Sequence, residues 1–182
     1  MIDKTITAIA AFLDEIAQGR VVAAFVYGSV AAGTAKADSD IDCFVLLKAR
    51  NDDTLARRLR AGFILLQTRL GFTPDVRYPV ELFTPGDCQR ALSGPQVARA
   101  LRQATSGQPV DSHLAETDAV EVLRALLGPR LTVRASRDLD ALTRQAQRVL
   151  ASAVGPDADA GARMVLEALG VKHQPSSAKE DA

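Results

Sequence analysis

The residues best suited to chemistry lie in one stretch, YGSVAAGTAKADSDID, which runs from Tyr27 to Asp42. Gly28 and Ser29 follow the apolar run VVAAFV, which has the length and composition of a buried strand. A helix that begins here can offer its first backbone N–H groups to a phosphate, with Gly28 allowing close approach and Ser29 capping the helix. The Gly-Ser pair therefore indicates a phosphate-binding turn.

Asp40 and Asp42 lie two residues apart at the start of the next apolar run, which we predict to be a strand. Strand alternation puts both carboxylates on one face, while Ile41 points into the core. Two such carboxylates repel each other unless a cation lies between them, and a hard divalent ion prefers oxygen ligands. Together with the phosphate-binding turn, they indicate chemistry on a nucleoside triphosphate. The simpler interpretation of Asp40 and Asp42 is that, together with Ser39, they only cap a turn at the edge of the strand.

The same stretch resembles the signature of the polymerase-beta-type nucleotidyltransferase superfamily, in particular its minimal members. The pattern is a strand, Gly-Ser, a spacer that contains a glycine (here Gly33), and Ser-Asp-x-Asp leading into the next strand. The resemblance covers residues of about 20 to 85, and Ala32 departs from it, because many members carry a longer polar or basic residue there. It implies an α/β fold with a small mixed sheet and flanking helices, which here precedes a helical C-terminal part.

The resemblance also implies a third carboxylate on a neighbouring strand. We choose Glu81 because it lies inside the short strand-like run YPVELF, although many members have aspartate here. Asp75 and Asp87 are the alternatives, and both lie beside prolines in predicted loops. The simpler interpretation of Glu81 is an ordinary solvent-facing strand residue.

By this resemblance, the cofactor is Mg²⁺, held by the catalytic carboxylates Asp40, Asp42 and Glu81, and Gly28, Ser29 and Ser39 bind the nucleoside triphosphate. The implied reaction moves a nucleoside monophosphate, AMP as first choice, to a hydroxyl. Relatives of this type modify small antibiotics such as aminoglycosides or adenylylate a partner toxin protein, and the sequence leaves both acceptors open. The alternatives are a catalytically silent binding module or antitoxin-like partner protein, and a hydrolase that uses the same site.

The composition and the first residues of the chain indicate which partners and which cellular compartment to expect. Lys and Arg together number 22, as do Asp and Glu, and aromatic residues make up 4% of the chain, which argues against a long nucleic acid as substrate. The first residues, MIDKTITAIAAFLDEIAQ, carry acids within an amphipathic pattern, which is untypical of a signal peptide. With no apolar run of membrane-spanning length, we expect a cytoplasmic protein that does not enter a membrane.

Periodicity predicts strands over 21–27, 41–47 and 80–83. It predicts helices over 4–18, 54–70, 85–92, 95–104, 117–127, 136–153 and 159–169. After Pro85, the sequence contains almost no stretch with the pattern of a strand. We therefore predict a nucleotidyltransferase domain over 1–105, a helical region over 106–171 that could support a dimer, and a disordered polar tail over 172–182.

Overall fold

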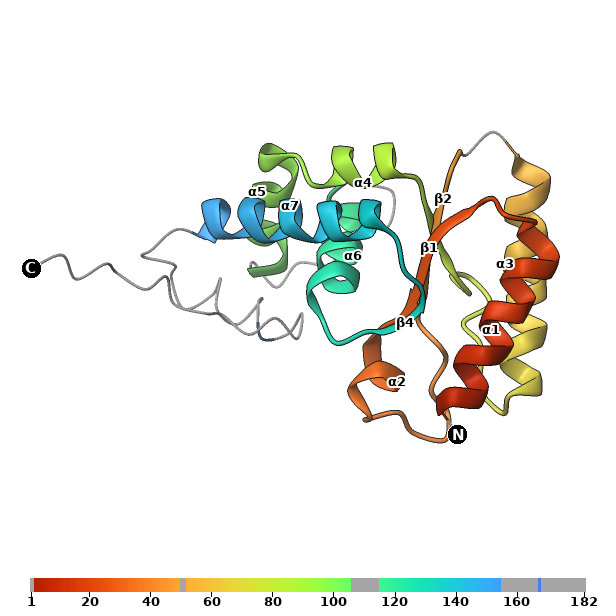
Figure 1. Cartoon of the computed structure of the whole chain (residues 1–182). Coiled ribbons are helices and arrows are strands. Elements are labelled where there is room, and N and C mark those ends of the chain that lie inside the picture. The colour runs from red at the N-terminus through yellow and green to blue at the C-terminus, as the bar shows by residue number, and fades with distance from the viewer. Residues whose placement is uncertain (1, 50–51, 106–114, 155–166, 168–182) are drawn as a thin grey trace, which may run out of the picture.

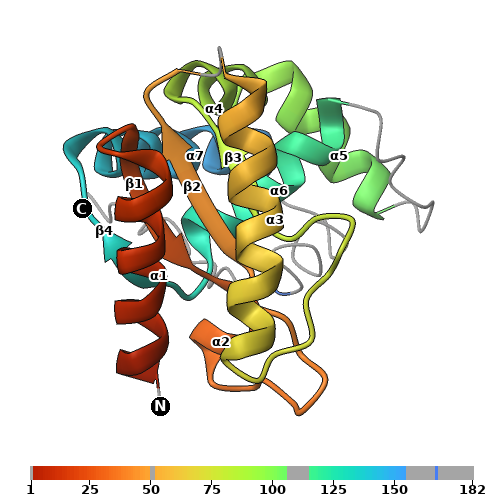
Figure 2. The ribbon, with the colours of Figure 1, turned by 90° about the vertical axis from the view of Figure 1, so that its right-hand side faces the viewer.

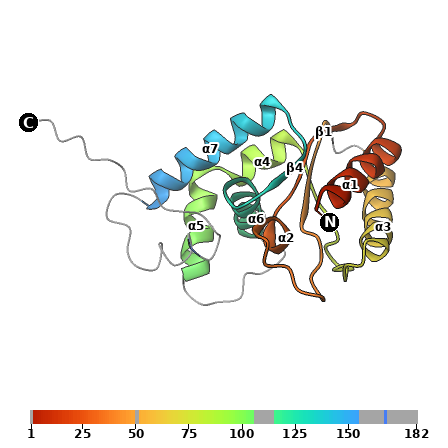
Figure 3. The same cartoon turned by 60° about the horizontal axis from the view of Figure 1, so that its bottom comes forward.

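The computed structural model describes residues 2–49, 52–105, 115–154 and 167. In these parts of the chain, a four-stranded sheet lies between two layers of helices (Figure 1). The view in Figure 3 shows the three layers edge on, with the sheet in the middle. This arrangement confirms the predicted mixed α/β class with a helical C-terminal part.

The sheet has the strand order β3-β2-β1-β4. Its strands are β1 (Val21–Val26), β2 (Cys43–Leu47), β3 (Glu81–Phe83) and β4 (Leu131–Arg134). β1 pairs antiparallel with β2 and with β4, whereas β2 and β3 are parallel. β1 and β2 are almost entirely buried because helices cover both of their faces, which explains why their sequences are continuous apolar runs.

One face of the sheet is covered by α1 (Ile2–Ala17) and α3 (Asp53–Arg69), which lie side by side in Figure 2. The side chain of Asp52 caps α3 by accepting a hydrogen bond from the N–H of Leu55. The core on this side contains the helical stripe of Leu55, Leu59 and Phe63 packed on the sheet.

The other face is covered by helices from the later part of the chain. These are α4 (Pro85–Ala91), α5 (Gly94–Thr105), α6 (Ala115–Leu127) and α7 (Arg137–Val154). Their apolar residues form a second core with the other side of the same strands. A short helix, α2 (Gly28–Ala32), lies at one end of the sheet, between β1 and the loop that leads to β2 (Figure 1).

β4 corrects the expectation that strand structure ends near residue 85. It lies between the helices predicted over 117–127 and 136–153, in the part of the chain where no strand was predicted, and it pairs with β1 at the edge of the sheet. Its four residues, LTVR, are too short for alternation to stand out, and its side chains are only partly buried or exposed. The division of the chain at residue 105 stays a prediction.

Two predicted segments lie mostly or wholly outside the described residues: the helix over 159–169, apart from Glu167, and the polar tail over 172–182. Among the helices that the structure describes, none is both long and apolar enough to cross a membrane.

Candidate active site

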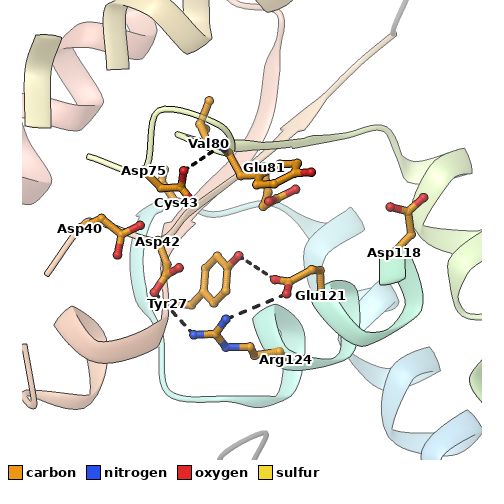
Figure 4. A pocket seen from close by; sticks show the side chains of 11 residues that line it. Tyr27, Asp40, Asp42, Cys43, Asp75, Val80, Glu81, Asp118, Glu121 and Arg124 are labelled. Atoms are coloured by element: carbon orange, nitrogen blue, oxygen red, sulfur yellow. Dashed lines mark hydrogen bonds and ion pairs between the residues drawn. The ribbon is translucent and has the colours of Figure 1, made fainter. Parts of the chain in front are cut away.

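A pocket of about 300 Å³ opens where the ends of the strands meet α6 (Figure 4). Six carboxylates and one guanidinium are among the groups that line it. The lining residues are Tyr27, Asp40, Asp42, Cys43, Asp75, Tyr78, Val80, Glu81, Asp118, Glu121 and Arg124. The pocket therefore brings together the three predicted catalytic carboxylates, which come from two separate segments of the chain.

Asp40 and Asp42 lie in the extended segment just before β2, so the strand begins two residues later than predicted. Backbone pairing with β1 nevertheless continues past the strand, because the N–H of Tyr27 donates to the carbonyl of Asp42 at 3.0 Å. Ile41 is 1% exposed and both aspartates line the pocket, which confirms the predicted alternation. The segment thus holds two carboxylates on one side and an apolar anchor on the other.

Gln67 of α3 connects the two segments that carry the carboxylates. Its buried side chain accepts a hydrogen bond from the N–H of Ile41 at 2.6 Å and donates one to the carbonyl of Pro79 at 3.2 Å. Sequence periodicity missed this residue, because a glutamine within an apolar helix stripe reads as a solvent-facing position. One amide therefore fixes the backbone between the aspartates relative to the backbone that leads into Glu81.

Glu81 is the first residue of β3 and lies opposite Phe44 in the parallel pairing with β2. Side chains alternate along this segment: Val80 and Leu82 pack in the core under α1 and α3, while Phe83 packs in the core on the other face. Glu81 shares the face of Phe83, where it is partly buried and lines the pocket. This environment disfavours the interpretation of Glu81 as an ordinary solvent-facing residue.

The two alternative third carboxylates lie in different places. Asp75 also lines the pocket, and its carboxylate accepts hydrogen bonds from the N–H groups of Arg77 and Tyr78 at 2.8 and 3.3 Å. Asp87 lies in α4 rather than in a loop, where it completes a capping box with Thr84. Asp75 therefore remains a rival of Glu81, whereas Asp87 serves the start of a helix and is not among the residues lining the pocket.

Gly28 is required by two features of the structure. Its φ is +65°, in the left-handed region, and a Cβ atom at this position would lie 1.9 Å from Oδ2 of Asp42. Only a residue without a side chain allows the backbone to pass so close to this carboxylate. The glycine of the Gly-Ser pair thus makes room for the second aspartate of the Asp-x-Asp pair.

Ser29 does not cap α2, which corrects the predicted capping role. The helix begins at Gly28, its N-cap is Tyr27, and Tyr27 makes no side-chain capping hydrogen bond. Because the helix starts two residues earlier than a helix capped by Ser29 would, Ser29 falls inside the first turn instead of at its boundary. Its predicted contact with a nucleotide is a separate hypothesis that stays a prediction.

Ser39 lies in the loop before the aspartates and is not among the residues that line the pocket. Its hydroxyl accepts a hydrogen bond from the N–H of Lys36 at 2.8 Å, and its own N–H donates to the carbonyl of Lys36 at 3.1 Å. These bonds shape the turn that leads into Asp40. A contact between Ser39 and a nucleotide stays a prediction.

The wall opposite the strands comes from α6, and sequence reasoning singled out none of the residues that this helix puts into the pocket. Asp118, Glu121 and Arg124 recur every three residues and face the pocket (Figure 4). The hydroxyl of Tyr27 donates to Oε2 of Glu121 at 3.2 Å, and the guanidinium of Arg124 lies 3.6 Å from Oδ2 of Asp42. The polar spacing was visible in the sequence, but nothing local indicated that this helix folds back over the strand ends.

Burial and crowding of negative charge shift the ionisation of the site. Burial raises the pKa of Asp42 to about 6; Arg124 opposes this shift, and Asp40 adds to it. Burial also raises the pKa of Glu81 to about 7, with further contributions from Glu121 and Asp118. Both carboxylates therefore hold protons more tightly than ordinary surface carboxylates do, and a bound cation would relieve the repulsion.

Within the described residues, no group of three or more His, Cys, Asp and Glu side chains is arranged so that it could already hold a metal ion. The chemistry of the donors nevertheless fits a hard divalent ion. Asp40, Asp42 and Glu81 offer only oxygen ligands and line one pocket, in which the raised pKa values of the last two reflect burial among like charges. Their role as metal ligands stays a prediction.

Residues 6–94 match the family model of the nucleotidyltransferase domain. These residues form a nucleotidyltransferase domain. The mixed sheet with its flanking helices is consistent with the nucleotidyltransferase fold, and the matched residues include Gly28, Asp40, Asp42 and Glu81. At the level of the family, the domain indicates a transferase that moves a nucleotidyl group. No curated protein and no solved structure matches the chain significantly.

Proposed function

We propose that this protein is a Mg²⁺-dependent nucleotidyltransferase that moves a nucleoside monophosphate, with AMP as first choice, from a nucleoside triphosphate to a hydroxyl. The single observation that supports this most is that Asp40, Asp42 and Glu81 line one pocket within a nucleotidyltransferase domain. The acceptor is a small molecule or a protein. The zero net charge and the aromatic content of 4% favour both over a long nucleic acid.

In this proposal, Asp40, Asp42 and Glu81 hold the magnesium. When bound, the metal supplies a Lewis acid that lowers the pKa of the acceptor hydroxyl and neutralises the triphosphate. The N–H groups of Gly28 and Ser29 bind phosphate oxygens beside Asp42. The acceptor oxygen forms a bond to the α-phosphorus, the bond from that phosphorus to the bridging oxygen breaks, and pyrophosphate leaves.

Glu81 is the residue we propose as the proton acceptor in this reaction. The hydroxyl must lose its proton as the new P–O bond forms, and the ionised carboxylate of Glu81 can take it. Without metal, burial raises the pKa of Glu81 to about 7 and that of Asp42 to about 6. A magnesium ion bound to these carboxylates would lower both pKa values, so that Glu81 would be ionised and able to accept the proton at neutral pH.

A second candidate is a catalytically silent binding module on the same fold. The observation that favours it is that Asp42 already has a cationic neighbour in Arg124, while the carboxylates as they lie do not form a ready ligand group among the described residues. Such a protein would bind a partner without requiring magnesium or a triphosphate. The two candidates differ in a property that can be measured before any acceptor is known.

The test is calorimetric titration of ATP into the protein, with and without Mg²⁺, and with the other nucleoside triphosphates for comparison. The wild type is compared with the double variant Asp40→Asn/Asp42→Asn. The matched control is Asp38→Asn, which changes an exposed carboxylate of the same loop that is not among the residues lining the pocket. We expect magnesium-dependent binding in the wild type and the control, and its loss in the double variant.

Absence of binding to the folded wild type at millimolar nucleotide would reject the enzyme and favour the binding module. If nucleotide binds, pyrophosphate release is then measured with hydroxyl-bearing small molecules and proteins as acceptors. Pyrophosphate together with a modified acceptor supports transfer. Free nucleotide without a modified acceptor would instead identify a hydrolase.

A further inference from the structure

Arg124 is the only basic residue among the described side chains that line the pocket. Its guanidinium lies 3.6 Å from Oδ2 of Asp42, 4.0 Å from Oε1 of Glu121 and 5.5 Å from the centre of the Tyr27 ring. Figure 4 shows it reaching from α6 toward Asp42 across the end of the pocket. The guanidinium therefore lies beside the second aspartate of the Asp-x-Asp pair.

The two ion pairs of Arg124 are loose. Both distances are longer than an ordinary hydrogen bond, and the side chain keeps 38% of its surface exposed. Arg130 provides a contrast, because it too lies 5.5 Å above an aromatic ring, that of Phe25. Arg130 is fixed by hydrogen bonds to the carbonyl of Leu126 at 3.2 Å and to Thr143 at 3.1 Å. Arg130 therefore belongs to the packing, whereas Arg124 can change its partner.

We propose that Arg124 binds the polyphosphate of the incoming nucleotide, and that Asp42 and Glu121 hold it over the pocket until the nucleotide arrives. This inference rests on the proposed function. A guanidinium fits phosphate oxygens with paired, charge-assisted hydrogen bonds, which are shorter and stronger than its present contacts. A divalent ion at Asp42 would compete with Arg124 for the negative charge of this carboxylate and would weaken a contact that is already 3.6 Å long, which leaves the guanidinium available to the phosphates.

The arrangement of charge around Arg124 supports this role. The pocket places six carboxylates around one guanidinium, which is unfavourable for a polyanion unless cations offset it. A magnesium ion at the strand wall would offset one side, and Arg124 is the cation available on the helix wall. The competing interpretation is that Arg124 only clamps α6 onto the strand ends through Asp42.

The test measures nucleotide and metal affinity separately in Arg124→Gln and Arg124→Lys, with Arg130→Gln as the matched control. ATP, ADP and AMP are titrated in the presence of Mg²⁺, and Mn²⁺ is titrated alone into the nucleotide-free protein. We expect Arg124→Gln to weaken ATP binding by about tenfold or more, because a charged hydrogen-bond partner of the phosphates is lost. AMP binding should change by less than about threefold, because AMP lacks the phosphates that Arg124 contacts.

For Mn²⁺ we expect the affinity to change in the opposite direction to the affinity for ATP. Without the guanidinium at Asp42, the nucleotide-free Arg124→Gln protein should bind Mn²⁺ several-fold more tightly than the wild type. Arg124→Lys keeps the charge but loses the planar fork, so it should weaken ATP binding less than Arg124→Gln does. If Arg124→Gln does not fold, the ATP affinity of Arg124→Lys tests the inference instead. Arg130→Gln should leave both affinities unchanged, whatever its effect on stability.

Unchanged ATP affinity in a folded Arg124→Gln protein with a lowered melting temperature would overturn the inference and identify Arg124 as a clamp. Equal losses for AMP and ATP would also overturn it, because the effect would then not depend on the outer phosphates. A wild type that binds no nucleotide rejects the proposed function itself, and the inference with it. A wild type that binds nucleotide, with Arg124→Gln unaffected, rejects only the inference.

Discussion

The two faces of the sheet are covered by helices in different ways. Under α1 and α3, the core is apolar apart from a few buried polar groups, and the buried amide of Gln67 bonds only to backbone. On the opposite face, α6 puts Val122 and Leu123 into the core but turns Glu121 and Arg124 toward the strand ends. One layer fixes where the carboxylates lie, and the other sets their electrostatic surroundings.

Because of this difference, substitutions in the two helical layers should affect the site in different ways. Changes under α1 and α3 should alter the site through the position of the backbone, and they should lower stability at the same time. Changes on α6 should alter charge and affinity at the pocket, with smaller effects on stability. The variants below test this contrast, in order of expected size.

The largest effect on stability is expected for Gln67→Leu. The substitution leaves the N–H of Ile41 and the carbonyl of Pro79 buried without their partner, and each lost bond costs about 1–3 kcal/mol. We therefore expect the free energy of unfolding to fall by about 3 kcal/mol or more, measured by denaturant titration. Binding of Mg²⁺ and ATP to the folded protein should weaken as well.

Gln147→Leu is the matched control, because it makes the same change at an exposed position of α7. It should alter stability by less than about 0.5 kcal/mol. If Gln67→Leu is no more destabilised than this control, Gln67 does not fix the two segments.

Gly28→Ala should have the next largest effect, and Gly33→Ala separates its two causes. Both glycines have positive φ, +65° and +71°, but a Cβ at Gly28 meets the carboxylate of Asp42, while one at Gly33 meets no atom within 4 Å. We expect about 1 kcal/mol of destabilisation for Gly33→Ala, from the backbone alone, and about 2–3 kcal/mol for Gly28→Ala. Equal losses for the two variants would show that the closeness of Gly28 to Asp42 carries no cost.

The pH dependence of stability tests the crowding of charge around Glu81. Its pKa rises to about 7 in the folded protein through burial, Glu121, Asp118 and Asp42, while Arg60 opposes the rise. The folded state therefore holds the proton longer than the unfolded state, and stability contributed by this group is lost as the pH rises from about 4.3 through 7. Glu81→Gln removes this loss.

The stability of Glu81→Gln relative to the wild type should accordingly be near zero at pH 4 and grow to roughly 2 kcal/mol at pH 6. The measurement is the free energy of unfolding of the metal-free proteins across this range. A difference that does not change with pH would contradict both the burial of Glu81 and its crowding by the carboxylates around it.

The smallest effect is expected for Tyr27→Phe. It removes the hydrogen bond to Glu121 while keeping the buried ring, so about 1 kcal/mol of stability should be lost in thermal or chemical unfolding. Tyr78→Phe is the control, because Tyr78 also lines the pocket but is 59% exposed. A loss for Tyr27→Phe no larger than for Tyr78→Phe would show that the link between β1 and α6 contributes nothing.

Sequence reasoning was most successful where the signal is local. The Gly-Ser pair, the Asp-x-Asp pair and the strand-like run around Glu81 each involve residues a few positions apart, and the structure puts Asp40, Asp42 and Glu81 in the lining of one pocket. The class of the fold follows from the same strands. Even here, the start of α2 was predicted two residues late, because a small shift of the first turn decides whether Ser29 caps the helix or lies within it.

What the sequence did not reveal depends on contacts between distant segments. β4 is short and half-exposed, so only its pairing with β1 makes it a strand. Gln67 is polar in an otherwise apolar stripe, and its use becomes clear only beside the backbone of Ile41. The stripe that contains Arg124 has ordinary helical spacing, and only the packing of α6 places it beside Asp42.

The most direct test of the central claim is a crystal structure of the protein with Mn²⁺ and a non-hydrolysable ATP analogue, in which anomalous scattering locates the metal. We predict a metal with oxygen atoms of Asp40, Asp42 and Glu81 at about 2.0–2.6 Å, and the triphosphate beside Gly28. A metal bound by Asp40, Asp42 and Asp75, with Glu81 turned away, would contradict the assignment of Glu81. A nucleotide bound elsewhere, with no metal at Asp40 and Asp42, would contradict the account as a whole.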